Sequence, residues 1–283
     1  MPWLVRKKCT IIAIIQGKEN MKNWHRIVVK VGTSTLAHPG GRLNIRHIEE
    51  LVKVLSDLKN AGNEVILVSS GAIAMGVGKL NLNRKPSDLS GKQACAAVGQ
   101  CELMYVYDKL FSEYNHIVAQ VLLTGEDLLD EKRNANVRNT IDRLLKLNCL
   151  PILNENDTIS TQEITSIGDN DTLAALVSAS IDADLLILLS DIDGLYTADP
   201  RKDKNAAIVH RVTAVNDRIR KMAGGAGSDQ GTGGMATKIH AAEICLNHSI
   251  DMVIANGAEP GILYDIFDGK ETGTLFTKEA KGK

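Results

Sequence analysis

The sequence predicts an α/β fold, an open sandwich of helices around a mainly parallel sheet. From Arg26 onward, apolar runs of strand length alternate with longer segments of helical periodicity, which is typical of parallel strands joined by covering helices. At 283 residues with 44% hydrophobic content, the chain is long enough for one large domain or two modest ones. No repeat, low-complexity run or Pro/Ser-rich linker divides it, so we expect one domain with two functional halves.

The elements are expected in a regular order along the chain. Strands are expected at 26–32, 64–70, 116–123, 149–153, 184–190 and 251–255. Helices are expected at 44–60, 92–114, 134–148, 171–180 and 235–248. The first helix is clearest, because its apolar residues form one stripe between a candidate N-cap, Asn44, and a stop signal, Gly62. The order of the strands within the sheet does not follow from the sequence.

The net charge of the protein does not favour binding to nucleic acid or to an anionic membrane. Lys and Arg total 33 against 34 Asp and Glu, a formal net charge of -1, which gives no general attraction to nucleic acid or an anionic membrane.

The five cysteines are scattered without a Cys-x-x-Cys pair, which suits a reducing cytoplasm. Two interpretations of Cys95 and Cys101 compete, a redox couple and a pair of inert semi-buried thiols, and the second is favoured.

The first 20 residues join a basic patch to a short apolar run, Thr10–Ile15, and resemble a signal sequence only superficially. The run is too short to span a membrane, which takes roughly 20 apolar residues. A second methionine, Met21, directly precedes the first patterned strand. We therefore expect residues 1–22 to be a poorly ordered extension and residues 23–283 to form the single domain.

Candidate ligand-binding residues follow the expected strands, where open α/β sheets gather their ligands. After the first strand, Lys30, Gly32 and Thr33 offer an anionic oxygen a cation, close backbone approach and a hydroxyl. After the second, Ser70 opens SGAIAMG, where the amino end of a short helix would bind carboxylate or phosphate. Each has a structural alternative, an ordinary strand end for the first and a tight packing turn for the second.

Two clusters of carboxylates and carboxamides lie farther along the chain. Residues 154–157, NEND, follow a strand, and residues 168–171, GDND, precede a helix. Such residues often provide turn and cap chemistry, and Asp169 or Asn170 is an expected helix cap. The alternative is a polar pocket that binds an α-amino and an α-carboxylate group through opposed charge and amide hydrogen bonds. The residues themselves leave both interpretations open.

Two more loops have the features of a phosphate site. Residues 190–200, SDIDGLYTADP, leave the most hydrophobic strand, and residues 231–238, GTGGMATK, open a helix. In the second loop, glycines give backbone access, the helix amino end supplies partial positive charge, and Lys238 lies about one turn inside. No Gly-x-x-x-x-Gly-Lys-[Ser/Thr] loop occurs, and a loose dinucleotide fingerprint lacks its preceding strand and following acidic residue.

With these elements in order, the chain from Arg26 to about Thr277 resembles the amino acid kinase family, whose fold is a three-layer α/β/α sandwich with a mainly parallel sheet. The combination of SSGAIAMG, NEND, GDND, DGLYTADP and GTGGMATK is similar to the glutamate 5-kinase branch. The resemblance implies ATP-dependent phosphorylation of the L-glutamate γ-carboxylate to γ-glutamyl phosphate, the first step of proline biosynthesis. It also implies a substrate site in the N-terminal half and an ATP site in the C-terminal half.

The resemblance assigns roles to particular residues of this chain. Lys30 and Lys238 would flank the transferring phosphoryl group as catalytic residues, and Asp171 would hold both lysines. The residues expected to contact the substrate are Ser70, Asp157 and Asn170. Those expected to bind ATP are Lys30, Gly32, Ser190, Asp191, Thr232, Gly233, Gly234, Met235, Ala236, Thr237 and Lys238. Mg²⁺ would be held through the ATP phosphates, with no separate metal site on the protein.

The chemistry implied by the resemblance needs no general base, because the glutamate γ-carboxylate is already ionised near neutral pH. Catalysis would then consist of in-line positioning and neutralisation of charge. The implied partners are L-glutamate, ATP, proline as a feedback inhibitor, further copies in a homo-oligomer, and a downstream glutamate-5-semialdehyde dehydrogenase. Nucleic acid and membrane are not expected, and the expected location is the cytoplasm.

Two departures from the family pattern bear on regulation. Many bacterial members carry a C-terminal RNA-binding-type (PUA) domain, and this chain ends at Lys283, before such a domain. Ser166 precedes GDND where several members have a basic residue. The competing functions are a sibling kinase acting on carbamate, aspartate or uridylate, and an amino-acid sensor without turnover. Lys30, Asp171 and Lys238 together argue against the sensor, and SSGAIAMG with NEND argues against the siblings.

Overall fold

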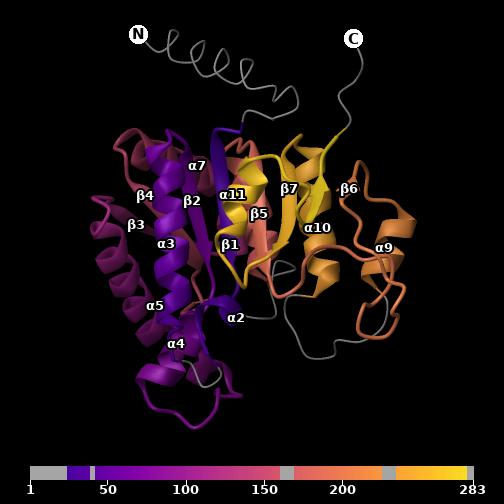
Figure 1. The fold of residues 1–283 in the computed structure, drawn as a ribbon. Coiled ribbons are helices and arrows are strands. Elements are labelled where there is room, and N and C mark those ends of the chain that lie inside the picture. The colour runs from indigo at the N-terminus through magenta and orange to yellow at the C-terminus, as the bar shows by residue number, and fades with distance from the viewer. Residues whose placement is uncertain (1–23, 39–41, 160–168, 225–233, 279–283) are drawn as a thin grey trace, which may run out of the picture.

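The computed structural model describes residues 24–38, 42–159, 169–224 and 234–278, which form helices on both faces of one sheet (Figure 1). The strands are β1 (Arg26–Val31), β2 (Glu64–Ser69), β3 (Val118–Leu123), β4 (Leu150–Glu155), β5 (Leu185–Ser190), β6 (Arg211–Val212), β7 (Asp251–Asn256) and β8 (Thr274–Phe276). The longer helices are α3 (Ile45–Asn60), α4 (Ala72–Lys79), α5 (Leu89–Ser112), α7 (Glu131–Lys146), α8 (Asn170–Ser180) and α10 (Met235–Asn247). Every expected strand and helix is confirmed, with small shifts at the ends.

The strand order is β3-β4-β2-β1-β5-β7-β8-β6. From β3 to β7 along this order all neighbours run parallel, and β8 pairs antiparallel with β7. The chain passes from β4, on one side of β1, to β5 on its other side. The carboxyl ends of β2, β1 and β5 therefore lie side by side at a reversal of strand order, where open α/β sheets bind ligands.

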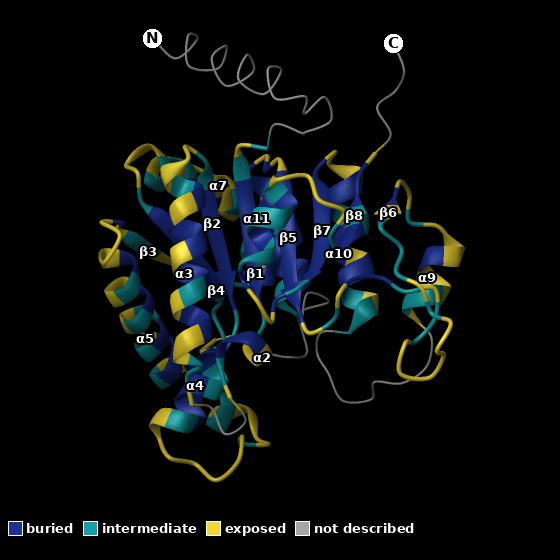
Figure 2. Cartoon of the chain, viewed as in Figure 1, coloured by how far each residue is buried: buried dark blue, intermediate teal, exposed yellow. Residues whose placement is uncertain are grey.

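Two hydrophobic cores lie on the opposite faces of the sheet. In β1, Ile27, Val29 and Val31 belong to the core under α3 and α5, whereas Val28 belongs to the core under α7, α8 and α10. Figure 2 shows the buried strands as the dark middle layer. Because side chains alternate along a strand, Lys30 points to the same face as Val28. The alternation thus directs a lysine toward α8 and α10.

Local signals explain where two of the helices begin and one ends. The Asn44 side chain accepts a hydrogen bond from the His47 amide, and Asp169 accepts from two amides in the first turn of α8. Both are the N-caps of their helices, as the sequence predicted. Gly62, just after α3, has φ of 97°, a left-handed conformation that favours glycine and stops the helix.

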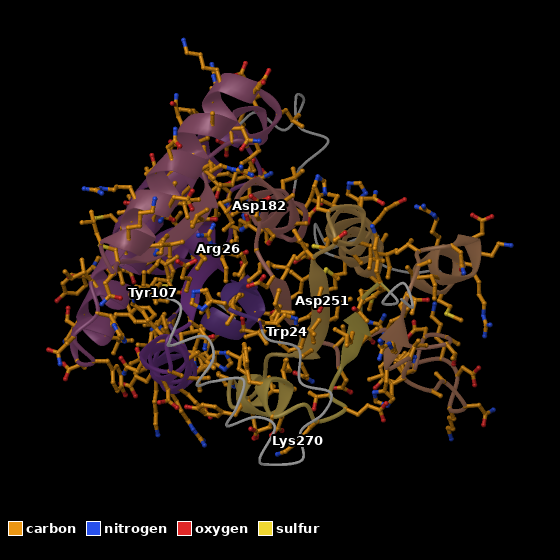
Figure 3. The ribbon with its side chains drawn as sticks, turned by 90° about the horizontal axis from the view of Figure 1, so that it is seen from above. Trp24, Arg26, Tyr107, Asp182, Asp251 and Lys270 are labelled. Carbon is orange, nitrogen blue, oxygen red and sulfur yellow. The ribbon has the colours of Figure 1, made fainter. Side chains whose placement is uncertain are left out.

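The amino ends of the strands are closed by polar pairs. The Trp24 indole donates to Asp251 at 2.8 Å, and Figure 3 looks down on this edge, with both residues labelled. The Arg26 guanidinium pairs with Glu64 and Asp142 at 2.7 and 3.0 Å. These pairs join groups from separate elements across the amino edge of the sheet.

Several short elements were not predicted from the sequence. They are α2 (Thr33–Leu36), α6 (Gly125–Leu129), α9 (Asp217–Ala223), α11 (Ile262–Phe267), β6 and β8. None exceeds seven residues, so apolar periodicity has too few turns or alternations to reveal it. Pairing with β7 rather than any local pattern fixes β8.

The N-terminal segment, Ser166, the cysteines and the lengths of the apolar helices were also the subject of predictions from the sequence. Residues 1–22 and Ser166 lie outside the described residues. Both Cys95 and Cys101 are free thiols. The expectation that both are semi-buried is wrong, because Cys95 is buried and Cys101 is exposed on α5. Within the described ranges, no helix is long and apolar enough to cross a membrane.

Helices α4 and α5 pack with their backbones in contact at two glycines. A Cβ atom on Gly76 would lie 1.9 Å from the Cys95 carbonyl oxygen, and one on Gly99 would lie 1.8 Å from the Ala72 carbonyl oxygen. No side chain fits between helices this close. The contact fixes Ala72, and with it the first turn of α4, at the carboxyl edge of the sheet.

We expect Gly99→Ala to lower the free energy of unfolding by about 3 kcal/mol, because the added methyl group forces the two helices apart. Urea unfolding followed by circular dichroism measures the loss. Gly261→Ala is the control, since its added Cβ would have the Glu50 carboxylate oxygen at 3.8 Å as its nearest neighbour. The control should change by less than about 0.5 kcal/mol, and equal stability of the two variants would contradict the backbone contact.

Candidate functional site

A cleft of about 600 Å³ opens at the carboxyl edge of the sheet, beside the ends of β1, β2 and β5. Strand ends and the starts of helices form its walls. Most of the residues that the sequence assigned to a site meet here: Lys30, Gly32, Ser70, Asp157, Asn170, Asp171, Ser190, Asp191 and Lys238. Residues far apart in the chain are thus brought together as predicted.

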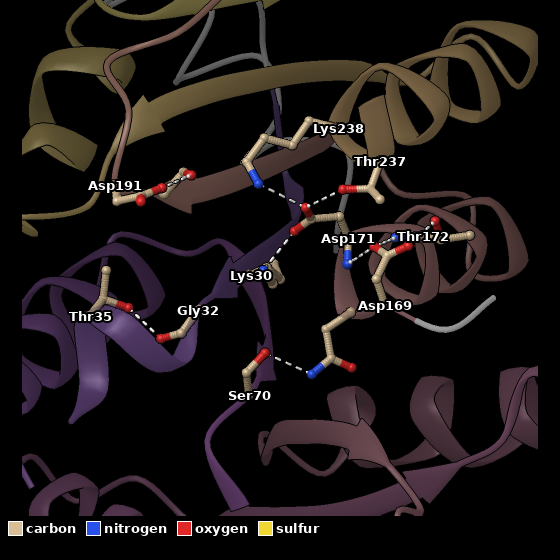
Figure 4. Close-up of polar contacts among 12 residues, drawn as sticks. Lys30, Gly32, Thr35, Ser70, Asp169, Asp171, Thr172, Asp191, Thr237 and Lys238 are labelled. Carbon is tan, nitrogen blue, oxygen red and sulfur yellow. Dashed lines mark hydrogen bonds and ion pairs between the residues drawn. The ribbon is translucent and has the colours of Figure 1, made fainter. Parts of the chain in front are cut away.

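A buried carboxylate bridges two lysines in this cleft (Figure 4). Lys30 Nζ lies 2.6 Å from Asp171 Oδ1, and Lys238 Nζ lies 2.9 Å from Asp171 Oδ2. The Asp171 side chain is 1% exposed. Burial disfavours its charged form, but the two lysines outweigh burial and hold the pKa of Asp171 below its usual value. Two ammonium groups around one carboxylate leave a net positive charge facing the cleft.

Each member of this cluster is positioned by a different element. Strand alternation directs Lys30 from β1 toward α8, as described above. Asp171 is the second residue of α8, behind the Asp169 cap. Lys238 lies in the first turn of α10, whose N-cap is Gly234. The Thr237 hydroxyl lies 3.2 Å from the same Asp171 oxygen that Lys238 contacts, so α10 holds this carboxylate at two points.

The other half of the cleft contains uncharged amide and hydroxyl groups. Asn170 Nδ2 donates to Ser70 Oγ at 2.7 Å and to Asn154 Oδ1 at 3.1 Å. Asn154 Nδ2 donates in turn to Gln100 Oε1 at 2.9 Å. Residues 71–74, at the amino end of α4, line the same space. The prediction of a short helix after Ser70 is therefore confirmed.

An acidic pair with one neighbouring lysine completes this half. Burial raises the pKa of Asp157 to about 6, the Glu155 carboxylate adds to the rise, and Lys85 opposes it. All three residues line the cleft. Glu155 and Lys85 were not assigned to the site from the sequence. Glu155 lay within NEND as possible turn chemistry, and nothing local separates Lys85 from an ordinary solvated lysine.

A smaller cavity of about 270 Å³ lies on the side of Asp191 and α10. Its walls combine apolar and polar groups, among them Ile192, Leu195, Tyr196, Asp199, Pro200, Arg201 and Met222. Gly234, Met235 and Ala236 line this cavity rather than the central cleft. Thr232 and Gly233, which the sequence also assigned to ATP, lie outside the described residues.

Burial accounts for one further residue that sequence reasoning missed, Gln100. It is 7% exposed, and its side chain accepts a hydrogen bond from Asn154, which lines the cleft. A single glutamine in a long helix carries no signal of such a contact. Only the three-dimensional pairing of α5 with β4 reveals it.

Comparisons with known proteins agree on one family. Residues 25–256 match the amino acid kinase family. The glutamate 5-kinase of Clostridium perfringens is 52% identical over 262 residues, which cover 92% of this chain and 97% of that protein. The glutamate 5-kinase of Carboxydothermus hydrogenoformans is 54% identical over 265 residues, covering 93% of this chain and 71% of that protein.

Solved structures with low sequence identity share the fold. The UMP kinase of Bacillus anthracis has a TM-score of 0.60 at 15% identity, covering 92% of this chain and 98% of that one. The isopentenyl phosphate kinase of T. acidophilum has a TM-score of 0.60 at 16% identity, covering 89% and 99%. From the family match, these folds and relatives that are more than half identical, we conclude that the chain belongs to the amino acid kinase family, in its glutamate 5-kinase branch.

Proposed function

We propose that this protein transfers the γ-phosphoryl group of ATP to the γ-carboxylate of L-glutamate, giving γ-glutamyl phosphate and ADP at the start of proline biosynthesis. The observation that carries the proposal is the Asp171 bridge between Lys30 and Lys238. It lies between a polar half suited to an amino acid and a glycine-opened helix suited to a nucleotide. The glutamate 5-kinases related to this chain support the choice of acceptor.

The proposed mechanism consists of positioning and charge stabilisation. Negative charge spreads over the oxygens of a transferring phosphoryl group, and fixed positive groups stabilise it. Lys30 and Lys238 would supply that charge from opposite sides, and Asp171 holds both ammonium groups in place before substrate arrives. The attacking carboxylate is already ionised near neutral pH, so no side chain is needed to remove a proton.

ATP is proposed to span the cleft and the smaller cavity. The positive Lys30–Asp171–Lys238 cluster fits polyphosphate, and residues 234–236 add the amides of a helix start. Ser190 and Asp191, at the end of β5, lie between the two spaces. Mg²⁺, held through the ATP phosphates, would neutralise charge during transfer. The substrate residues Ser70, Asp157 and Asn170 would then precede the nucleotide loops at 190–191 and 232–238 within a single domain, 23–283.

Further partners are proposed from the same chemistry. Proline shares the α-ammonium and α-carboxylate of glutamate, so it would compete at Ser70, Asp157 and Asn170 without being phosphorylated. The acyl phosphate product is reactive and would pass to a glutamate-5-semialdehyde dehydrogenase. A homo-oligomer acting in the cytoplasm, where ATP and free glutamate occur, completes the proposal.

The acceptor is tested by measuring ADP release in a coupled assay with Mg²⁺ and ATP. We expect turnover with glutamate and none with aspartate, carbamate, acetylglutamate or uridylate. Hydroxylamine should trap the product as a hydroxamate, which separates acyl transfer from simple ATP hydrolysis. Turnover with another acceptor would identify a sibling kinase, and binding of glutamate without ADP release would identify a sensor.

We expect Asp171→Asn to lower kcat about 100-fold or more, because the two ammonium groups lose the charge that orients them. Removing one partner of a buried ion pair also costs about 3–5 kcal/mol of stability. Activity is therefore measured at a temperature where circular dichroism shows the variant folded. Asp184→Asn is the control, since that carboxylate accepts from the backbone amides of His25 and Arg26 at the other edge of the sheet. A near-normal kcat in Asp171→Asn would remove Asp171 from the catalytic set.

We expect glutamate recognition to weaken as the pH falls through about 6, the pKa to which burial raises Asp157. Protonation removes the negative charge that pairs with the substrate ammonium. The kcat/KM for glutamate should fall about tenfold per pH unit below this value, as for a single ionisation. Asp157→Asn should be weaker at high pH and lack this dependence. An unchanged profile in the variant would assign the ionisation to another group.

Asp157→Asn should weaken glutamate binding but stabilise the fold. The pKa of Asp157 in the folded protein lies above the unfolded value of about 3.9, so the charged carboxylate destabilises the fold above about pH 6. Asp157→Asn should therefore raise the free energy of unfolding at about pH 8, measured with urea. Such a gain excludes unfolding as the cause of weaker glutamate binding. A lower free energy of unfolding in the variant would show that the buried charge of Asp157 does not destabilise the fold.

A further inference from the structure

A directional chain of hydrogen bonds runs through the substrate half of the cleft. It begins at Gln100 Oε1, which accepts from Asn154 Nδ2 at 2.9 Å. Asn154 Oδ1 then accepts from Asn170 Nδ2 at 3.1 Å, and the same nitrogen donates to Ser70 Oγ at 2.7 Å. Gln100 lies behind the cleft lining, and Asn154, although buried, belongs to that lining together with Asn170 and Ser70. These hydrogen bonds therefore link the orientation of a buried side chain, Gln100, to the orientation of the side chains that face the ligand.

The chemistry of amides fixes what each end of this chain can offer a ligand. An amide nitrogen has two hydrogens and accepts nothing. Both hydrogens of Asn170 Nδ2 are in use, so only its Oδ1 remains, and that atom is buried without a hydrogen-bond partner among the described residues. A buried acceptor of this kind calls for a donor. Ser70 Oγ already accepts, which leaves its own hydrogen available for an acceptor.

The remaining groups match the two charged ends of an α-amino acid. An ammonium group only donates and a carboxylate only accepts. Asn170 Oδ1 and the Asp157 carboxylate suit the ammonium, and the Ser70 hydroxyl with the free amides at the start of α4 suits the carboxylate. We propose that this chain sets the orientation of the α-amino acid substrate, and that Gln100 is the positioning residue which sets its direction. The identity of the substrate rests on the proposed function.

Gln100 has this effect because it decides which way the Asn154 amide faces. Asn154 Oδ1 also accepts from the Glu155 amide at 2.9 Å, but Gln100 is the group that satisfies the buried Nδ2. Without an acceptor at position 100, that nitrogen is left unpaired and the turned amide becomes less unfavourable. A turned Asn154 would present its nitrogen to Asn170 Nδ2, so two donors would face each other and the chain would break.

The first test compares two substitutions of Gln100 in the full-length protein. Gln100→Met keeps the size of the side chain but removes the acceptor, and should raise the KM for glutamate about three- to tenfold, the loss expected for one hydrogen bond. The kcat and the KM for ATP should stay within about twofold. Gln100→Glu restores an acceptor, and should recover most of the KM although it buries a charge and lowers the melting temperature more.

A purely structural role predicts a different ranking of these variants. Glutamate KM would then follow stability, with Gln100→Glu worse than Gln100→Met, and this order would overturn the proposal. Ser178→Ala is the matched control, because it removes one buried hydrogen bond, to the Ala174 carbonyl at 2.7 Å, in the same helix as Asn170. Its KM for glutamate should equal that of the wild type. A wild-type KM in Gln100→Met would also overturn the proposal.

The second test reverses the polarity at the cleft wall. Asn170→Asp adds a negative charge near the substrate ammonium, so simple attraction predicts tighter glutamate binding. The hydrogen-bond chain predicts weaker binding, by about tenfold, because the new carboxylate opposes Asn154 Oδ1 and takes the Ser70 hydrogen away from the ligand. An acidic residue is well tolerated in the first turn of a helix, so the fold should survive. A glutamate KM at or below that of the wild type would overturn the proposal.

Measurements on the wild-type protein distinguish a failure of this inference from a failure of the proposed function. If it releases no ADP with glutamate, the proposed function fails, and the inference is decided by titration calorimetry with glutamate in the absence of ATP. Weaker binding by Asn170→Asp and Gln100→Met than by the wild type would uphold the orientation chain. No glutamate binding by the wild type, or equal affinity in all three proteins, would overturn it.

Discussion

One carboxylate shared between two lysines is the interaction on which the cleft depends. Asp171 is 1% exposed and lies 2.6 and 2.9 Å from the ammonium groups of Lys30 and Lys238. Three buried charges are acceptable only because each is paired. The pairing also fixes the geometry of the site, because the end of β1 and the first turns of α8 and α10 must all meet at the Asp171 carboxylate. The net positive charge that remains is the feature of the site best suited to phosphate.

In the proposed function, the two halves of the cleft would recognise their ligands by different physical means. The half around Lys30, Asp171 and Lys238 would use fixed charge, which acts on any anion of suitable size. The other half would use amides whose donors and acceptors are already assigned, so it would respond to the direction of a ligand as well as its charge. The close contact of α4 with α5 at Gly76 and Gly99 holds this side still. On this proposal, fixed charge would supply attraction, and the amide network beside Asp157 would supply selectivity.

The sequence predicted the fold well where burial is continuous. Strands such as β5, buried along their whole length, produce unbroken apolar runs, whereas β6 and β8 have too few residues for any pattern. The clustering of Lys30, Asp171 and Lys238 followed from family resemblance, because no local spacing connects residues so far apart. Gln100 and Lys85 were missed, since one is a lone buried polar residue and the other looks like a surface lysine. Strand order came only from the structure, because the buried strands are chemically alike.

The position of the bridging carboxylate has a consequence for the synthesis of the protein. Lys30 belongs to the first strand of the sheet, whereas Lys238 belongs to α10, one of the last helices. A growing chain that has not yet reached α10 holds Asp171 with only one of its two counter-charges. The charge cluster can therefore close only after almost the whole domain has left the ribosome. A chain that still lacks α10 therefore lacks one of the two lysines that the proposed phosphoryl transfer needs.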